Sequence, residues 1–350
     1  MLILSSKTKS LASGQRPGYF VGRMPAAPGA PAARIMFSVA EVSADLHAAD
    51  LALELRRLRP SIALFGVGGE RMAAAGVDVH MDITDESTFG LWDILGTLPR
   101  HLRNLSAIRR MLRSERPDLV VLVDAPGLNF TVARVARRLG IRSVYYVPPQ
   151  TWLWNPGPAA RRLSRSVDLV VATFEREAAL YERAGARVAY YGHPLAGLAA
   201  GCHASKQAVR RRLGIPEDTN VVGLFPGSRK REIASLLPAM LEAARLSAAQ
   251  IHPLHVVAAA ASARLRPFIE RRLGGQGNQV QLLDRARDAL AASDVVLAAS
   301  GTVLLEAVAL DVPAVMTYRL DGLTRFYADR ILKVRRALSF YSIPNITAGE

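Results

Sequence analysis

Residues 221–246 read VVGLFPGSRKREIASLLPAMLEAARL, and this stretch predicts a β-strand, a tight turn and an α-helix in direct succession. An apolar run, residues 221–225, meets the breaker pair Pro226-Gly227. Apolar residues then recur at helical spacing from Ile233 to Ala244. A strand that turns directly into a helix is the unit from which α/β folds are built.

The turn of this unit has the chemistry of an anion site. Gly227 lets the backbone approach a ligand closely, and Ser228 and the free N–H groups of the new helix point at the same spot. Arg229 adds a planar cation suited to phosphate oxygens. The alternative interpretation is an ordinary strand–helix turn with a solvated Arg-Lys-Arg start.

Composition narrows the class of protein. The chain has 350 residues, enough for about two domains. Lys and Arg outnumber Asp and Glu by 45 to 30, a formal charge of +15 that indicates an anionic partner. The basic residues are mostly arginines without interleaved aromatic residues, so a nucleotide or an anionic membrane is favoured over nucleic acid. The single cysteine, Cys202, excludes an internal disulfide and fits a reducing cytoplasm, and no apolar run reaches the ~18 residues of a membrane span.

Residues 1–33 look foreign to the fold, because no acidic residue precedes Glu41 and residues 24–34 are rich in Pro, Ala and Gly. A transit-type presequence, or a start codon placed too early with Met24 or Met36 as the real start, would explain them. We expect an N-terminal domain over residues 34–198, a small-residue linker near its end, and a C-terminal domain over residues 199–350.

The same strand–helix rhythm runs through both expected domains, which predicts two doubly wound parallel sheets. The expected strands begin at Ile35 and continue at residues 62–65, 119–123, 143–147, 169–172, 188–191, 221–225, 255–260, 280–283, 295–297 and 314–318. A turn is expected at residues 41–45, followed by an amphipathic helix, and a second glycine-rich turn at residues 66–69.

Asp124 follows the apolar strand at residues 119–123, and an acid at the carboxyl end of a parallel strand faces the crevice where open α/β sheets bind ligands. It is thus a candidate general base, and the alternative is a turn or helix-capping aspartate. Ser300-Gly301-Thr302, ahead of a helix at residues 303–310, forms a second anion-receptive N-terminus. Glu306, one turn into that helix, is placed to bind a pair of ribose hydroxyls.

A third region suggests a membrane contact. Leu91, Trp92, Leu95 and Leu98 share one face of a helical wheel, next to a basic helix at residues 100–113. An apolar patch beside basic residues suits an interface with anionic lipid. The alternative is that these four side chains are core residues beneath a surface helix.

Together these motifs, in register from Ile35 to Glu350, resemble the lipid-A-disaccharide synthase family. The motifs that carry the resemblance are Glu41-x-Ser43-x-Asp45-Leu46-His47, Gly66-x-Gly68-Gly69-x-Arg71-Met72, Gly90-Leu91, Asp124-Ala125-Pro126-x-x-Asn129, Trp152-x-Trp154-x-Pro156-Gly157, Phe174-x-x-Glu177, Gly192-His193-Pro194-Leu195, Pro226-Gly227-Ser228-Arg229-x-x-Glu232, Ser300-Gly301-Thr302-x-x-x-Glu306 and Pro344-Asn345.

The resemblance implies the GT-B architecture, in which two Rossmann-like domains face a central cleft. It implies an inverting transfer of 2,3-diacylglucosamine from its UDP conjugate to the 6-hydroxyl of 2,3-diacylglucosamine 1-phosphate, known as lipid X, without a metal or other cofactor. It further implies a cytoplasmic protein, monomeric or homodimeric, that sits on the inner-membrane surface and binds no nucleic acid.

Site residues follow from the resemblance in three groups. Asp124 and Arg229 are expected to act in catalysis, and Leu91, Trp92, Leu95 and Leu98 to contact acyl chains or membrane. The residues expected to bind UDP or substrate are Glu41, Ser43, Asp45, Gly68, Gly69, Asn129, Gly227, Ser228, Glu232, Ser300, Gly301, Thr302, Glu306 and Asn345.

Three departures from the family pattern stand out. Ala44 replaces the usual glycine of the first turn, Pro148-Pro149-Gln150 replaces a Ser-Pro-Ser-like run, and the chain ends at Glu350 where the family continues for several tens of residues. Two other hypotheses therefore stay open: another UDP-sugar enzyme of the same architecture, either MurG-like or an epimerase, and a non-catalytic remnant or basic binding protein.

Overall fold

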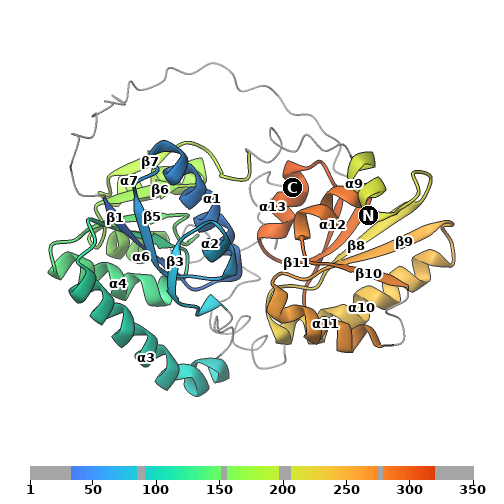
Figure 1. Ribbon diagram of the computed structural model, residues 1–350, viewed down its shortest axis with the longest axis horizontal. Coiled ribbons are helices and arrows are strands. Elements are labelled where there is room, and N and C mark those ends of the chain that lie inside the picture. Colours follow the sequence, from blue (N-terminus) through green and yellow to red (C-terminus); the bar gives the residue numbers. More distant parts are fainter. Residues whose placement is uncertain (1–32, 85–90, 151–155, 197–205, 275–278, 320–350) are drawn as a thin grey trace, which may run out of the picture.

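All the strand pairs that the structure describes are parallel, and they form two separate sheets. The computed structural model describes residues 33–84, 91–150, 156–196, 206–274 and 279–319, with the backbone alone for residues 91–98 and 156. Figure 1 shows the two sheets in two lobes, the N-terminal lobe in blue to green and the C-terminal lobe in yellow to red. The predicted class, α/β with two parallel-sheet domains, is confirmed.

The N-terminal sheet has seven strands in the order β3-β2-β1-β4-β5-β6-β7. Its strands are β1 (Arg34–Val39), β2 (Ala63–Val67), β3 (Asp78–Met81), β4 (Leu119–Val123), β5 (Arg142–Tyr146), β6 (Leu169–Ala172) and β7 (Val188–Tyr190). Its helices are α1 (Val42–Leu58), α2 (Glu70–Ala74), α3 (Leu91–Glu115), α4 (Pro126–Arg138), α6 (Pro156–Ser164) and α7 (Glu175–Arg183).

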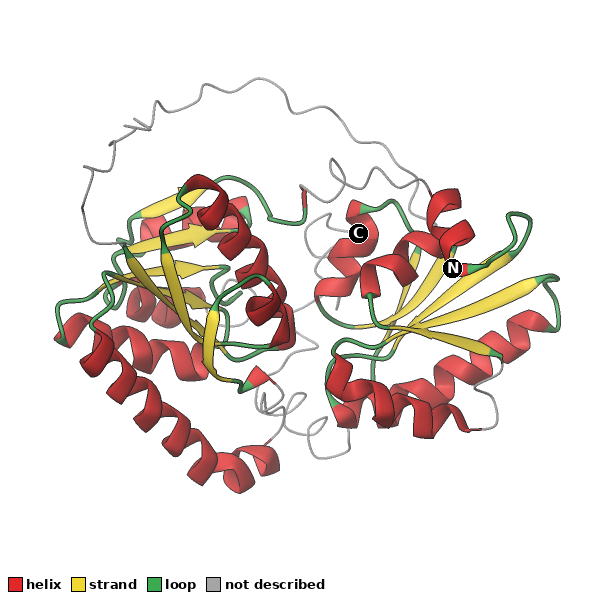
Figure 2. Ribbon diagram, in the orientation of Figure 1, coloured by secondary structure: helices red, strands yellow, loops and turns green. Residues whose placement is uncertain are grey.

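Helices cover both faces of this sheet (Figure 2). One core joins α1 and α2 to the strands through small residues such as Ala48 and Ala52. The other joins α3, α4, α6 and α7 to the opposite face through larger side chains such as Ile108, Leu163 and Tyr181. A strand covered on both sides needs no polar face, which explains the continuous apolar sequence of β4.

The C-terminal sheet has five strands in the order β10-β9-β8-β11-β12. Its strands are β8 (Asn220–Phe225), β9 (Leu254–Ala259), β10 (Val280–Leu283), β11 (Val295–Ala299) and β12 (Ala314–Thr317). Its helices are α9 (Lys206–Leu213), α10 (Lys230–Ala248), η2 (Ala263–Leu265), α11 (Arg266–Leu273), α12 (Ala286–Ala292) and α13 (Thr302–Ala309). The helices α10 and α11 pack on one face, and α9, α12 and α13 pack on the other.

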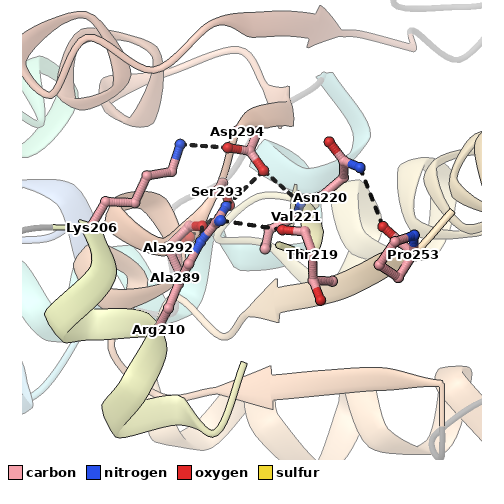
Figure 3. A network of polar contacts seen from close by, with 10 residues as sticks. All are labelled: Lys206, Arg210, Thr219, Asn220, Val221, Pro253, Ala289, Ala292, Ser293 and Asp294. Atoms are coloured by element: carbon pink, nitrogen blue, oxygen red, sulfur yellow. Dashed lines mark hydrogen bonds and ion pairs between the residues drawn. The ribbon is translucent and has the colours of Figure 1, made fainter. Parts of the chain in front are cut away.

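A polar network around Asp294 fastens α9 to the amino-terminal ends of β8 and β11 (Figure 3). One oxygen of the Asp294 carboxylate accepts from Lys206 at 2.6 Å, and the other accepts from the Val221 N–H and from Arg210, each at 2.7 Å. The guanidinium of Arg210 is buried and also donates to two backbone carbonyls. Burial opposes the ionisation of Asp294, but these hydrogen bonds outweigh it and hold the pKa of its carboxyl below the ordinary value.

Several predicted boundaries match the observed ones, notably those of β4, β6 and β10, while three features differ. The edge strand β3 was not predicted, because its sequence DVHM is half polar and its residues are half-buried or exposed. The helix α1 begins at Val42, so its first turn replaces the turn expected at residues 41–45. The helix α3 runs unbroken from Leu91 through Pro99.

Within the described part of the chain, no helix is both long enough and apolar enough to cross a membrane. The two sheets fall on either side of residue 198, and the expected domain boundaries at residues 33 and 198 stay predictions. Residues 1–32, the segment 151–155, most of the expected linker and residues 320–350 lie outside the described residues.

Candidate active site

Each sheet has a point where the strand order reverses, and ligands bind at such points outside the carboxyl ends of the strands. In the N-terminal sheet the reversal lies between β1 and β4, and in the C-terminal sheet between β8 and β11. Glu41 follows β1, Asp124 follows β4, Arg229 follows β8 and Gly301 follows β11. The chain order alone therefore brings these predicted site residues to the two reversal points.

Polar contacts join the carboxyl ends of the two sheets to each other. Each contact pairs a residue that follows a strand of one sheet with a residue that follows a strand of the other. The contacts are Arg229–Glu41 (3.3 Å), Arg287–Asp50 (3.2 Å), Arg264–Asp82 (2.6 Å), the Ala263 N–H to Glu70 (2.9 Å) and Arg71 to the Ala261 carbonyl (3.4 Å). The two reversal points thus face one another, and the loops of both domains line one site.

Asp124 occupies a backbone conformation that L-residues rarely adopt. Its φ is 47° and that of Ala125 is 46°, so two consecutive non-glycine residues lie in the left-handed region. The Asp124 carbonyl accepts the Tyr145 hydroxyl at 2.6 Å and the Asn129 amide at 2.8 Å. Its own N–H donates to the Val147 carbonyl at 3.2 Å. These bonds hold a strained turn that sets where the Asp124 side chain points.

The environment of the Asp124 carboxyl suits a base that works near neutral pH. Burial is the main cause that raises its pKa, the nearby Glu41 carboxylate adds to the effect, and the pKa reaches about 7. The Ala125 N–H and Arg229 act in the opposite direction. A carboxyl with a pKa near the working pH can both accept a proton and release it again.

Asn129 was predicted to bind substrate, but its side chain is fully buried and its amide is used internally. Its Nδ2 donates to the carbonyls of Ser38, Val123 and Asp124, and its Oδ1 accepts the Ser38 hydroxyl at 2.7 Å. This arrangement favours a role in positioning Asp124 over a direct contact with a ligand.

Asp45 was also predicted to bind substrate, together with Gly68 and Gly69. Its carboxylate is buried and accepts the N–H groups of Gly69, Arg71 and Met72 at the start of α2. A Cβ at Gly69 would lie 2.6 Å from Oδ2 of Asp45, so the glycine is needed for this close packing. These three residues fasten the β2–α2 turn to α1, and the structure favours that supporting role over a ligand contact.

Arg229, the N-cap residue of α10, lies between two carboxylates. Its Nη2 lies 3.3 Å from Oε2 of Glu41 in the other domain, and its Nη1 lies 3.1 Å from Oε1 of Glu232 on its own helix. Oε2 of Glu232 also accepts the Ser228 N–H at 3.3 Å. Gly227 has φ of 108°, and a Cβ there would lie 2.5 Å from Oε2 of Glu232. The carboxylates of Glu41 and Glu232 therefore occupy the hydrogen-bond donors that the sequence analysis assigned to a phosphate. An incoming anion has to displace these carboxylates.

The second predicted anion site lies at the start of α13. Ser300 and Gly301 are exposed, Thr302 is half-buried and Gly301 has φ of 153°. Glu306 is buried one turn further along, and burial raises the pKa of its carboxyl while Arg287 and Arg71 oppose the rise. Ser43, on the first turn of α1, is half-buried.

The remaining predicted site residues lie wholly or partly outside the described residues. Asn345 and the Trp152–Trp154 motif lie outside the described residues. Leu91, Trp92, Leu95 and Leu98 fall on the helical backbone of α3, but their side chains lie outside the described part. Among the residues described, no three His, Cys, Asp or Glu side chains are grouped so that they could hold a metal ion.

Two buried groups near Asp124 were not predicted as site residues. Tyr145 gave no signal, since a tyrosine in an apolar strand is indistinguishable from a core residue. Glu177, part of the motif Phe174-x-x-Glu177, is fully buried, and its Oε2 accepts the N–H and hydroxyl of Thr173. Burial raises the pKa of Glu177 to about 7, and Asp124 contributes to the rise.

A model of the lipid-A-disaccharide synthetase family matches residues 35–350. The lipid-A-disaccharide synthase of Geobacter metallireducens is 35% identical over 322 residues, which cover 92% of this chain and 82% of that protein. The synthase of Pseudomonas paraeruginosa is 39% identical over 319 residues, covering 91% of this chain and 83% of that protein.

Solved structures with the same arrangement of domains belong to UDP-sugar enzymes. A UDP-GlcNAc 2-epimerase from Neisseria meningitidis bound to UDP-GlcNAc matches with a TM-score of 0.57 at 14% identity, covering 85% of each chain. A UDP co-structure of MnaA from S. aureus matches with a TM-score of 0.58 at 10% identity, covering 89% of this chain and 92% of that one. At such identities the likeness concerns the fold, and it confirms the GT-B architecture.

Proposed function

The chain belongs to the lipid-A-disaccharide synthase family, and from that premise we propose that it joins two acylated glucosamine units in a single displacement. The family gives it a glycosyltransferase role in lipid A biosynthesis. The proposed donor is UDP-2,3-diacylglucosamine, the proposed acceptor is the 6-hydroxyl of 2,3-diacylglucosamine 1-phosphate, and the products are the β-1,6 disaccharide 1-phosphate and UDP.

The observation that carries the proposal is the approach of Asp124 and Arg229 from opposite domains. Their common neighbour, Glu41, forms an ion pair with Arg229 and raises the pKa of Asp124. A base on one side of the sugar and a cation on the other suit in-line displacement, which inverts the anomeric carbon. Such placement also lowers the entropic barrier for two bound substrates.

In the proposed step, Asp124 accepts the proton of the acceptor 6-hydroxyl as its oxygen attacks the anomeric carbon. The bond from that carbon to the diphosphate oxygen breaks, and its electron pair leaves with UDP. Arg229 and the N–H groups at the start of α10 meet the charge that grows on the diphosphate. Glu306, buried beside the start of α13, is the proposed partner of the ribose hydroxyls.

Both proposed substrates carry acyl chains, so we expect the protein to work at a lipid surface. We propose that α3 contacts this surface. The exposed side of α3 carries Arg100, Arg103, Arg109, Arg110 and Arg113, and the half-exposed Leu102 stands among them. A basic stripe continuing from the apolar Leu91–Leu98 segment suits anionic headgroups. Replacing Leu91, Trp92 and Leu95 by Ser should weaken sedimentation with anionic vesicles without lowering the melting temperature. Early melting of the variant would instead assign these side chains to the core.

Mass spectrometry of the products tests the proposed function directly. We expect the acylated UDP-glucosamine and lipid X to yield the disaccharide 1-phosphate with one UDP per disaccharide. Parallel reactions with non-acylated UDP-GlcNAc should give no disaccharide. Conversion of UDP-GlcNAc to an isomer, or UDP release without any disaccharide, would refute the proposal in favour of another UDP-sugar reaction.

A further inference from the structure

Glu41 links the two catalytic groups, although it stands on neither of their elements. It is the N-cap residue of α1, but its side chain makes no capping hydrogen bond. The carboxylate points instead across the domain interface to Arg229, at 3.3 Å, with about a quarter of each side chain exposed. This carboxylate therefore forms an ion pair across the domain interface and does not cap its own helix.

The same cation is what a diphosphate would bind. Arg229 already contacts Glu41 and Glu232, and the Ser228 N–H is directed at Glu232 as well. Glu232 belongs to the same helix as Arg229 and moves with it, whereas Glu41 belongs to the other domain. An anion at the β8–α10 turn must therefore compete with a carboxylate that comes from the domain carrying Asp124.

We propose, on the basis of the function proposed above, that Glu41 is a positioning residue whose ion pair with Arg229 is replaced by an ion pair between Arg229 and the donor diphosphate. This exchange couples donor binding to the proton affinity of Asp124. Before binding, the Arg229 cation compensates the Glu41 charge. Once the diphosphate has taken Arg229, the Glu41 carboxylate faces Asp124 without that cation. Donor binding thereby strengthens the base in the moment when an acceptor proton has to be taken up.

The electrostatics around Asp124 agree with this exchange. Arg229 and Glu232 act on the Glu41 carboxylate, and Glu41 and Arg229 act on Asp124. Asp124 in turn raises the pKa of Tyr145 on β5 and of Glu177 on α7. At Asp124 the two charges work against each other: Glu41 raises the pKa of its carboxyl and Arg229 lowers it. When Arg229 leaves its ion pair with Glu41, the pKa of Asp124 should therefore rise.

Glu41→Gln separates this role from a direct contact with the nucleotide. Glutamine keeps the size of the side chain but no longer competes for the cation by charge. A partly exposed ion pair is worth up to about 1 kcal/mol, so we expect the full chain to bind UDP roughly two- to fivefold more tightly after the change. A Glu41 that touches UDP would give weaker binding, and a purely structural Glu41 would leave the affinity unchanged; either result overturns the proposal.

The matched control is Asp82→Asn, which weakens another ion pair across the same interface, that of Arg264 and Asp82 at 2.6 Å. We expect its UDP affinity to equal that of the unchanged protein. Equal tightening by both variants would mean that any loosening of the interface favours UDP, and it would refute a specific exchange at Arg229.

The pH dependence of turnover provides the second readout. Because the Glu41 charge opposes ionisation of Asp124, its removal in Glu41→Gln should move the rise of kcat with pH toward lower pH. Glu41→Asp, which keeps the charge but shortens the reach to Arg229, should bind UDP more tightly and leave the rise where it is. A pH profile of kcat that does not move in Glu41→Gln would refute the coupling between Glu41 and Asp124. Absence of UDP binding to the unchanged protein would instead refute the proposed function itself.

Discussion

Tyr145→Phe tests how strongly catalysis depends on the strained turn at Asp124. The change removes one hydroxyl from a fully buried ring and leaves the shape of the core unchanged. That hydroxyl donates to the Asp124 carbonyl at 2.6 Å, and a hydrogen bond of this kind contributes about 0.5–1.5 kcal/mol to stability. Because the Asn129 amide still donates to the same carbonyl, no acceptor is left unsatisfied, and we expect a loss near 1 kcal/mol.

The effect on the rate should exceed what this loss of stability would suggest. Left-handed residues are held only where the surroundings enforce them, and here one of two donors to the carbonyl disappears. A displacement of about 1 Å at a reacting group costs about a hundredfold in rate. With Asn129 still in place, we expect kcat to fall between about threefold and thirtyfold, while the KM for the acceptor stays nearly constant.

Tyr181→Phe is the matched control in the same core. Its ring is also fully buried, and its hydroxyl donates to the Pro149 carbonyl at 2.8 Å. Urea unfolding should give similar losses of stability for the two variants, and steady-state release of UDP should separate them. The reasoning is refuted if Tyr145→Phe keeps the full rate, or if Tyr181→Phe lowers kcat by the same factor.

Three further outcomes are expected. The rate should rise with pH through about 7, because burial raises the pKa of Asp124 and only its ionised form accepts a proton. Asp124→Asn should lower turnover about 10²- to 10⁴-fold and leave the affinity for UDP unchanged. A near-normal rate of this variant would exclude Asp124 as the base. Arg229→Lys should slow turnover less than Arg229→Ala, and both should depress kcat more than UDP affinity, since the planar cation acts most on the departing diphosphate; equal, near-normal values would move the diphosphate site to residues 300–302. Asp294→Asn should lower the free energy of unfolding by about 1–3 kcal/mol at pH 7, because Arg210 and the Val221 N–H lose a charged acceptor. The pKa of Asp294 in the folded protein lies below its ordinary 3.8, so the difference in unfolding free energy between the two proteins should shrink as the pH falls below that value. A difference that persists in acid would contradict the charge-based explanation.

The sequence was most informative where one local pattern determines one element. Continuous apolar runs predicted β4 and β6 to the residue, since a strand covered on both faces has to be apolar throughout. The edge strand β3 escaped notice because half of its residues face outward and are polar. A basic helix was expected at residues 100–113, yet α3 begins at Leu91 and continues through Pro99.

The limits of prediction at the site have a different origin. The resemblance implies that Asp45 and Asn129 bind substrate, whereas in the structure both side chains turn inward and hydrogen-bond to backbone groups. Direction of this kind depends on what packs beyond the turn, which no local pattern encodes. The pair of Arg229 and Glu41 is 188 residues apart in sequence, so neither residue carries a sign of the other.

Because the proposed site takes residues from both sheets, we expect the protein to acquire its proposed activity late in its own synthesis. Domains of a growing chain fold as units, the N-terminal one first, and that unit already carries Asp124 and Glu41. It lacks the guanidinium of Arg229 until β8 and α10 have left the ribosome. A chain that ends before β8 thus carries Asp124 and Glu41 without Arg229, and by the proposed mechanism we expect it not to cleave the nucleotide-sugar donor.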